Sequence, residues 1–100
     1  MKIVWSPKAR SRALAAVEYI ADERPSVAVR WFDALVERIE LLKELPEQGR
    51  IVPEWGDPQI REVIHSPSRI IYEVFPDRVE ILTLSHDRQI LHPRGTSTSE

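Results

Sequence analysis

The sequence contains no cysteine, only three glycines and no long run of apolar residues. The lack of cysteine excludes disulfides, thiol nucleophiles and cysteine-bound zinc, and it fits a protein of a reducing compartment. Glycine is too rare for a glycine-rich backbone loop that binds phosphate. No stretch approaches the ~18 consecutive apolar residues of a membrane-spanning helix, and the first residues do not resemble a signal peptide. We therefore expect a cytoplasmic protein that does not associate with membranes.

Lysine is also scarce, because eleven of the 14 basic residues are arginine. There are 16 Asp and Glu residues, so the formal net charge is -2, which does not support a generally basic surface for nucleic acid. The three histidines, His65, His86 and His92, lack the spacing of metal ligands. Motifs for serine hydrolases, nucleotide binding and paired catalytic carboxylates are also missing. We expect no metal and no cofactor.

Two helical segments precede three strand-like segments. Ser6 followed by Pro7 is a strong helix start, since serine caps helices and proline fits the first helical position. Apolar residues at helical spacing define both helices, and Pro46 disfavours helix at the residue before it. The predicted elements are a short strand at 3–5, helices over 6–22 and 25–44, a loop at 48–58, and strands over 60–64, 69–75 and 79–85.

This β-α-α-β-β-β order predicts an α+β fold, with two N-terminal helices packed on a mostly antiparallel, curved sheet. We expect one domain over residues 3–91 and a flexible tail over 92–100, because the tail has no apolar residue. Alternation predicts one apolar and one mixed face for the middle strand. In the last strand, it places Leu82 and Leu84 on one face and Val79 and Ile81 on the other.

Five basic residues could converge on one region if the strands form hairpins. They are Arg50 in the loop, Arg61 and Arg69 in the first hairpin, and His86 and Arg88 after the last strand. Clustered guanidinium groups with one imidazole suit phosphodiester chemistry, in which arginine stabilises phosphate charge and histidine transfers a proton. The same groups suit binding to an acidic protein segment. The structural alternative is that these are surface arginines in ordinary ion pairs with Glu54, Glu62, Glu73 and Asp87.

A second basic group lies at the start of the first helix. Lys8, Arg10 and Arg12 crowd its first turns, where the helix dipole is already positive. Each unfavourable term is only a few tenths of a kcal/mol, so solvent can tolerate it. The alternative is a basic rim that binds an acidic partner.

Five segments, in this order and spacing, resemble the RelE/ParE superfamily of toxins from bacterial type II toxin–antitoxin modules. They are Ser6-Pro7-Lys8-Ala9 and the segments 46–54, 60–63, 69–74 and 85–89. The resemblance spans residues 3 to about 91 and implies two N-terminal helices on a curved antiparallel sheet. It also implies a cognate antitoxin as partner, with which the toxin forms a hetero-oligomer. Lys8, Arg10 and Arg12 are then candidates for antitoxin binding.

Members of this superfamily either cleave mRNA on the ribosome or inhibit DNA gyrase. For a nuclease, the resemblance implies Arg61 as the catalytic arginine, Glu54 near the base and His86 near the terminal catalytic group. The chain lacks the terminal tyrosine and loop lysines of RelE-like nucleases, and its net charge of -2 is poor for ribosomal RNA.

The ending His86-Asp87-Arg88 is similar to that of ParE-like members. We therefore expect a ParE-like toxin that inhibits gyrase without chemistry of its own. The candidates for target binding are Arg50, Arg61, Arg69, His86 and Arg88. The alternatives are a ribosome-dependent mRNA endoribonuclease and a non-toxic module that only binds the antitoxin.

Overall fold

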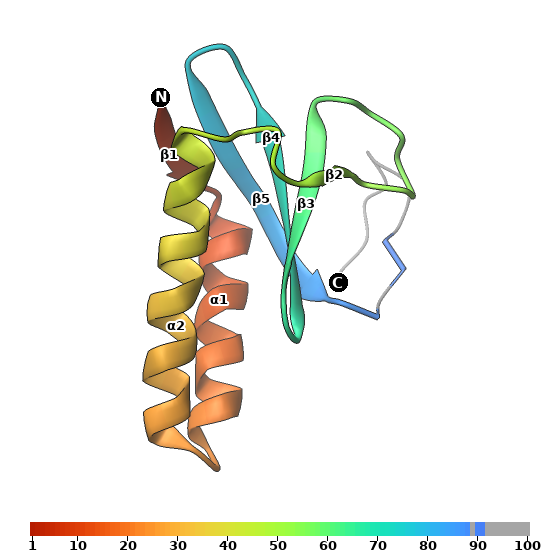
Figure 1. Cartoon of the computed structure of the whole chain (residues 1–100). Coiled ribbons are helices and arrows are strands. Elements are labelled where there is room, and N and C mark those ends of the chain that lie inside the picture. The colour runs from red at the N-terminus through yellow and green to blue at the C-terminus, as the bar shows by residue number, and fades with distance from the viewer. Residues whose placement is uncertain (89, 92–100) are drawn as a thin grey trace.

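The computed structural model describes residues 1–88, 90 and 91, so the predicted tail at 92–100 lies outside the described residues. Two helices are followed by most of a five-stranded sheet (Figure 1). The elements are β1 (Lys2–Trp5), α1 (Pro7–Ala21), α2 (Pro25–Glu40), a 3-10 turn η1 (Leu41–Lys43), β2 (Arg50–Ile51), β3 (Ile60–His65), β4 (Ser68–Val74) and β5 (Arg78–His86). The α+β prediction is confirmed.

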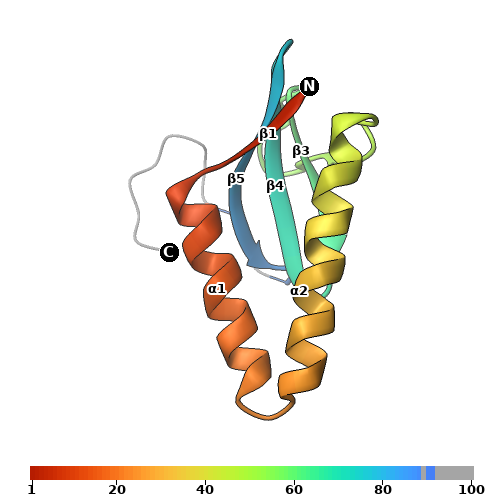
Figure 2. The same cartoon turned by 90° about the vertical axis from the view of Figure 1, so that its left-hand side faces the viewer.

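The two helices form an antiparallel pair that packs on one face of the sheet (Figure 2). The predicted cap of α1 is present, since the Ser6 hydroxyl accepts a hydrogen bond from the Ala9 N–H at 2.9 Å. The second helix was expected to reach residue 44, but its α-helical part ends at Glu40 and continues as the η1 turn. Within the described residues, no helix is long and apolar enough to cross a membrane.

The sheet has the strand order β1-β5-β4-β3-β2. β3, β4 and β5 form the two consecutive hairpins expected from the sequence, and all their pairings are antiparallel. β1 pairs in parallel with the first half of β5, from Arg78 to Ile81. β5 therefore extends beyond β1 as a sheet edge that no other described strand covers.

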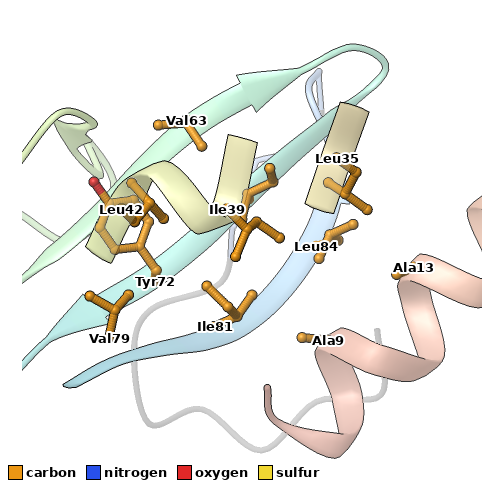
Figure 3. Close-up of a cluster of buried hydrophobic side chains, with 11 residues drawn as sticks. Ala9, Ala13, Leu35, Ile39, Leu42, Val63, Tyr72, Val79, Ile81 and Leu84 are labelled. Atoms are coloured by element: carbon orange, nitrogen blue, oxygen red, sulfur yellow. The ribbon is translucent and has the colours of Figure 1, made fainter. Parts of the chain in front are cut away.

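The main core lies between the helices and this sheet (Figure 3). Leu35 and Ile39 of α2 and Leu42 of η1 point toward the strands, and all three are almost fully buried. Ala9 and Ala13 are the core residues of α1, and their small side chains let that helix approach β5 closely. The buried strand residues are Val63, Ile70, Tyr72, Val79, Ile81 and Leu84.

A β-bulge changes the faces of β5. Ile71 pairs with Thr83, whereas the next residue, Tyr72, pairs with Ile81, so Leu82 is an extra residue in the strand. Strict alternation is broken there, and Ile81 and Leu84 both face the helices. The predicted assignment of β5 side chains to the two faces of the sheet is therefore wrong beyond Ile81. Leu82 packs instead against a smaller cluster on the opposite face of the sheet.

Candidate functional site

A buried carboxylate lies on the sheet face that the helices leave open. Glu62, in the middle of β3, has no exposed side-chain surface. Arg69 on β4 donates from Nε to its Oε1 at 2.7 Å, and Arg50 on β2 forms an ion pair with its other oxygen. Burying a lone carboxylate is very costly, so Glu62 depends on these two guanidinium groups. The burial of Arg69, whose side chain is 5% exposed, has the same explanation.

Arg69 also binds a second carboxylate. Its two terminal nitrogens lie 2.9 and 3.0 Å from the oxygens of Glu54, which is a bidentate pair. Chiefly through the bonds from Arg69, the pKa of Glu54 falls to about 2. The same bonds with Glu54 raise the pKa of Arg69. Both groups are therefore charged throughout the physiological range, and Arg69 is shared between two carboxylates.

The same carboxylate holds the chain after β5. The Leu91 backbone N–H donates to Glu54 at 3.0 Å. The Leu91 side chain is buried beside Val52, Ile60 and Ile71, with Trp55 and Leu82 packed around them. The open face of the sheet thus carries a second apolar cluster next to an ion-pair network, and Leu91 packs into that cluster.

Arg61 lies on the opposite face, the one that the helices cover. It pairs across the sheet with Tyr72 of the main core and donates to the Gly49 carbonyl at 3.0 Å. The Tyr72 hydroxyl in turn accepts from the Gly49 N–H and donates to the Pro46 carbonyl. Burial raises the pKa of Tyr72, so its hydroxyl remains protonated. Arg61 and Tyr72 together fix the loop that leads into β2.

His86 and Arg88 lie at the far end of the sheet. His86 pairs with Ser68, which pairs with His65. Since His65 is four residues beyond Arg61 on β3, His86 is displaced from Arg61 by about 13 Å along the strands. The expected convergence of the five basic residues is therefore wrong. Only Arg50 and Arg69 meet, through Glu62, because strand alternation sends Arg61 to the other face.

The separation of Glu54, Arg61 and His86 bears on whether the chain could cleave RNA. Glu54 is paired with Arg69 on the open face, Arg61 contacts the loop on the helix face, and His86 is at another end. General acid–base cleavage of RNA needs a base, an acid and a phosphate-stabilising cation around one phosphate. Glu54, Arg61 and His86 do not form such a set.

Two basic residues of α1 lie beside other elements, Arg12 at the edge of β5 and Arg10 at the groove between the helices. Arg12 donates from Nη1 to the Thr83 hydroxyl at 3.0 Å and to the Leu84 carbonyl at 3.2 Å. Lys8 and Arg10 are exposed. Arg10 borders an apolar groove that also includes Trp5, Ala13, Leu14, Phe32, Val36, Ile39 and Glu40.

A second groove lies between α1 and the free edge of β5. Arg12, Tyr19 and His86 border it, and Tyr19 is 80% exposed. The backbone edge here is partly capped, since Arg12 reaches the Leu84 carbonyl and the Ser6 hydroxyl donates to the Leu82 carbonyl at 2.7 Å. Exposed strand edges attract other strands, and such side-chain caps limit that pairing.

Glu62 was expected only as one of several surface ion-pair partners of the arginines, so its burial between Arg50 and Arg69 was not predicted. The anchoring of Leu91 was not predicted either. A signal for Glu62 existed, because strand alternation places it between Ile60 and Ile64 on one face of an interior strand, where a carboxylate needs a basic partner. Glu62 pairs across the sheet with Ile71 of β4, and Arg69 lies two residues before Ile71, so its side chain is on the same face as Glu62. No local signal indicated Leu91, since its partners are far away in the sequence.

A family model described as ParE toxin of type II toxin-antitoxin system, parDE, matches residues 3–91. The chain therefore belongs to the ParE toxin family. A search of curated protein sequences finds no significant match.

Among solved structures, the chain is similar to one titled chromosomal ParDE TA system from P. aeruginosa, with a TM-score of 0.72 and 21% sequence identity. The match covers 86% of this chain and 95% of that chain, and at this identity it supports the fold.

Proposed function

We propose that this chain is a toxin that inhibits DNA gyrase, acts in the cytoplasm and is neutralised by a cognate antitoxin. Membership of the ParE toxin family supports the toxin role. The observation that carries the choice of gyrase over RNA cleavage is the Glu54–Arg69–Glu62 network. Its carboxylates neutralise the arginine that would otherwise be free to bind phosphate on the open face.

Charge gives a second reason. Binding to RNA depends on cationic side chains that neutralise phosphates. Arg50 has a side chain that is 66% exposed, but it is paired with the buried Glu62. Arg61 is half-buried and bound to the Gly49 carbonyl. Inhibition by protein–protein contact requires no catalytic set, so this arrangement favours it over nuclease chemistry.

The supercoiling of a plasmid in cells distinguishes gyrase from ribosome-bound mRNA as the target. Expression of the toxin should relax a negatively supercoiled reporter plasmid and slow growth, while the 5′ ends of mRNAs remain unchanged. Co-expression of the antitoxin should restore both supercoiling and growth. Codon-dependent mRNA cleavage with normal plasmid supercoiling would favour the endoribonuclease. Normal growth at confirmed soluble expression would favour the non-toxic module.

For the antitoxin, we propose a segment with acidic and apolar residues that lies across α1 and α2 and reaches the edge of β5. The apolar groove beside Arg10 suits the nonpolar face of such a segment. Lys8, Arg10 and Arg12 supply the charge that is complementary to its acidic residues. Arg12 lies directly on the β5 edge, so an acidic side chain there would draw it away from the Leu84 carbonyl.

This antitoxin surface is tested by changing Lys8, Arg10 and Arg12 to alanine together. Affinity for the antitoxin should fall, and its dependence on salt should flatten, because the removed charges steer association. Arg24→Ala with Arg30→Ala is a matched control, since both residues are exposed at the other end of the helical pair. Equal affinity of the triple variant and wild type at low and high salt would contradict the proposal.

A further inference from the structure

The segment after β5 is held at both ends. At its start, the Asp87 N–H donates to the Pro67 carbonyl at 2.8 Å, which ties it to the β3–β4 turn. At its end, the Leu91 N–H donates to Glu54, and the Leu91 side chain is 6% exposed. The second anchor is charge-assisted, since Arg69 keeps Glu54 ionised. The short connection between them is therefore fixed to the domain at two points.

Between these anchors, the segment presents side chains to solvent. Ile90 is 78% exposed, although its neighbour Leu91 is buried. Arg88 is exposed, and its backbone N–H donates to the His86 ring at 3.1 Å. The Asp87 carboxylate lies 3.4 Å from that ring. Arg88 and Ile90 thus stand beside two residues, Asp87 and Leu91, whose backbone N–H groups are hydrogen-bonded to the domain, which lowers the entropy cost of binding.

We propose that Ile90 and Arg88 form a contact surface for the protein target and that Glu54 is the positioning residue that holds this surface in place. The inference rests on the proposed function, because the target is taken to be gyrase. The chemistry of the surface calls for an apolar pocket bordered by acidic groups. Glu54 does not touch the target. It acts through the Leu91 N–H and determines where Ile90 lies.

Ile90→Ala tests the contact directly. Its exposure means that the substitution should leave the fold intact. Inhibition of gyrase supercoiling should weaken by about tenfold if Ile90 fills a pocket in the target. Antitoxin affinity should stay at the wild-type value, because the proposed antitoxin surface is made by α1, α2 and the edge of β5 and does not include Ile90. Val29→Ala, which removes another largely exposed apolar side chain, is the matched control.

Glu54→Ala tests the positioning role. Loss of a hydrogen bond to a charged acceptor should speed amide exchange at Leu91 by about tenfold to a hundredfold. Gyrase inhibition should fall with it, while antitoxin affinity stays unchanged, which a general loss of folding would not produce. Glu54→Gln keeps an acceptor oxygen and should restore part of both signals. Glu80→Gln, which removes the charge of a surface partner of Arg78, should change neither.

Two results would overturn this inference. The first is that the Ile90→Ala variant inhibits gyrase as strongly as the wild-type protein does in the same assay. The second is fast exchange at Leu91 in Glu54→Ala with full inhibition. If the wild-type protein itself does not inhibit gyrase, the proposed function is wrong, and so is the proposed target contact. The rate of amide exchange at Leu91 would then still show whether Glu54 holds this residue in place.

Discussion

Replacing Arg69 by methionine would leave Glu62 buried with one partner instead of two. The side chain of Glu62 has no exposed surface, and its remaining partner, Arg50, is 66% exposed. Breaking a buried ion pair by removing one member costs about 3–5 kcal/mol. Glu54 also loses its bidentate partner, but its side chain is 20% exposed and can reach water. We therefore expect a loss of about 3–5 kcal/mol, mostly from Glu62.

Urea denaturation followed by circular dichroism measures this loss. For a domain of 100 residues with a total stability of about 5–15 kcal/mol, the midpoint should move by roughly 2 M. Combining Arg69→Met with Glu62→Leu should recover most of the stability, because an apolar pair of similar volume removes the buried charge. A loss below 1 kcal/mol in the single variant, or no recovery in the double variant, would refute the reasoning.

Three further effects follow from individual contacts. Gly49→Ala should destabilise by about 1–3 kcal/mol in the same denaturation assay, because a Cβ would lie 2.6 Å from the Tyr72 hydroxyl. Glu54 has a pKa lowered from 4.5 to about 2, so its contribution to stability is complete above pH 4.5 and is lost as the pH falls toward 2. Glu54→Gln should flatten that acid limb in denaturation at a series of pH values. Ser6→Ala should lower stability by about 1 kcal/mol, since it removes the cap of α1 and the bond to the Leu82 carbonyl.

Local signals explain why the order of elements was predictable. Ser6 and Pro7 mark the start of α1 through capping chemistry that acts within one turn. The spacing of Leu35 and Ile39 defines the buried side of α2, and both are almost fully buried. These features depend on neighbours in the sequence, so they can be interpreted without the tertiary structure.

The site residues were harder to predict, because their partners are distant in the sequence. The bulge at Leu82 shifts the register of one pair of strands, and simple alternation does not reveal it. Arg61 and Arg69 look equivalent in the sequence, but strand alternation places them on opposite faces. The Glu54–Leu91 contact joins a loop to a segment 37 residues later. Only the folded chain brings these groups together.

Supercoiling of relaxed plasmid by purified gyrase, with increasing amounts of this toxin, tests the central claim most directly. We predict inhibition that is relieved by the antitoxin, while mRNA on purified ribosomes stays intact under the same conditions. Arg61→Ala should change this inhibition by less than tenfold, since Arg61 binds the Gly49 carbonyl on the helix face and is not part of the proposed target contact. Unimpaired supercoiling, together with mRNA cleavage that falls by about 10²–10³-fold on Arg61→Ala, would contradict the account.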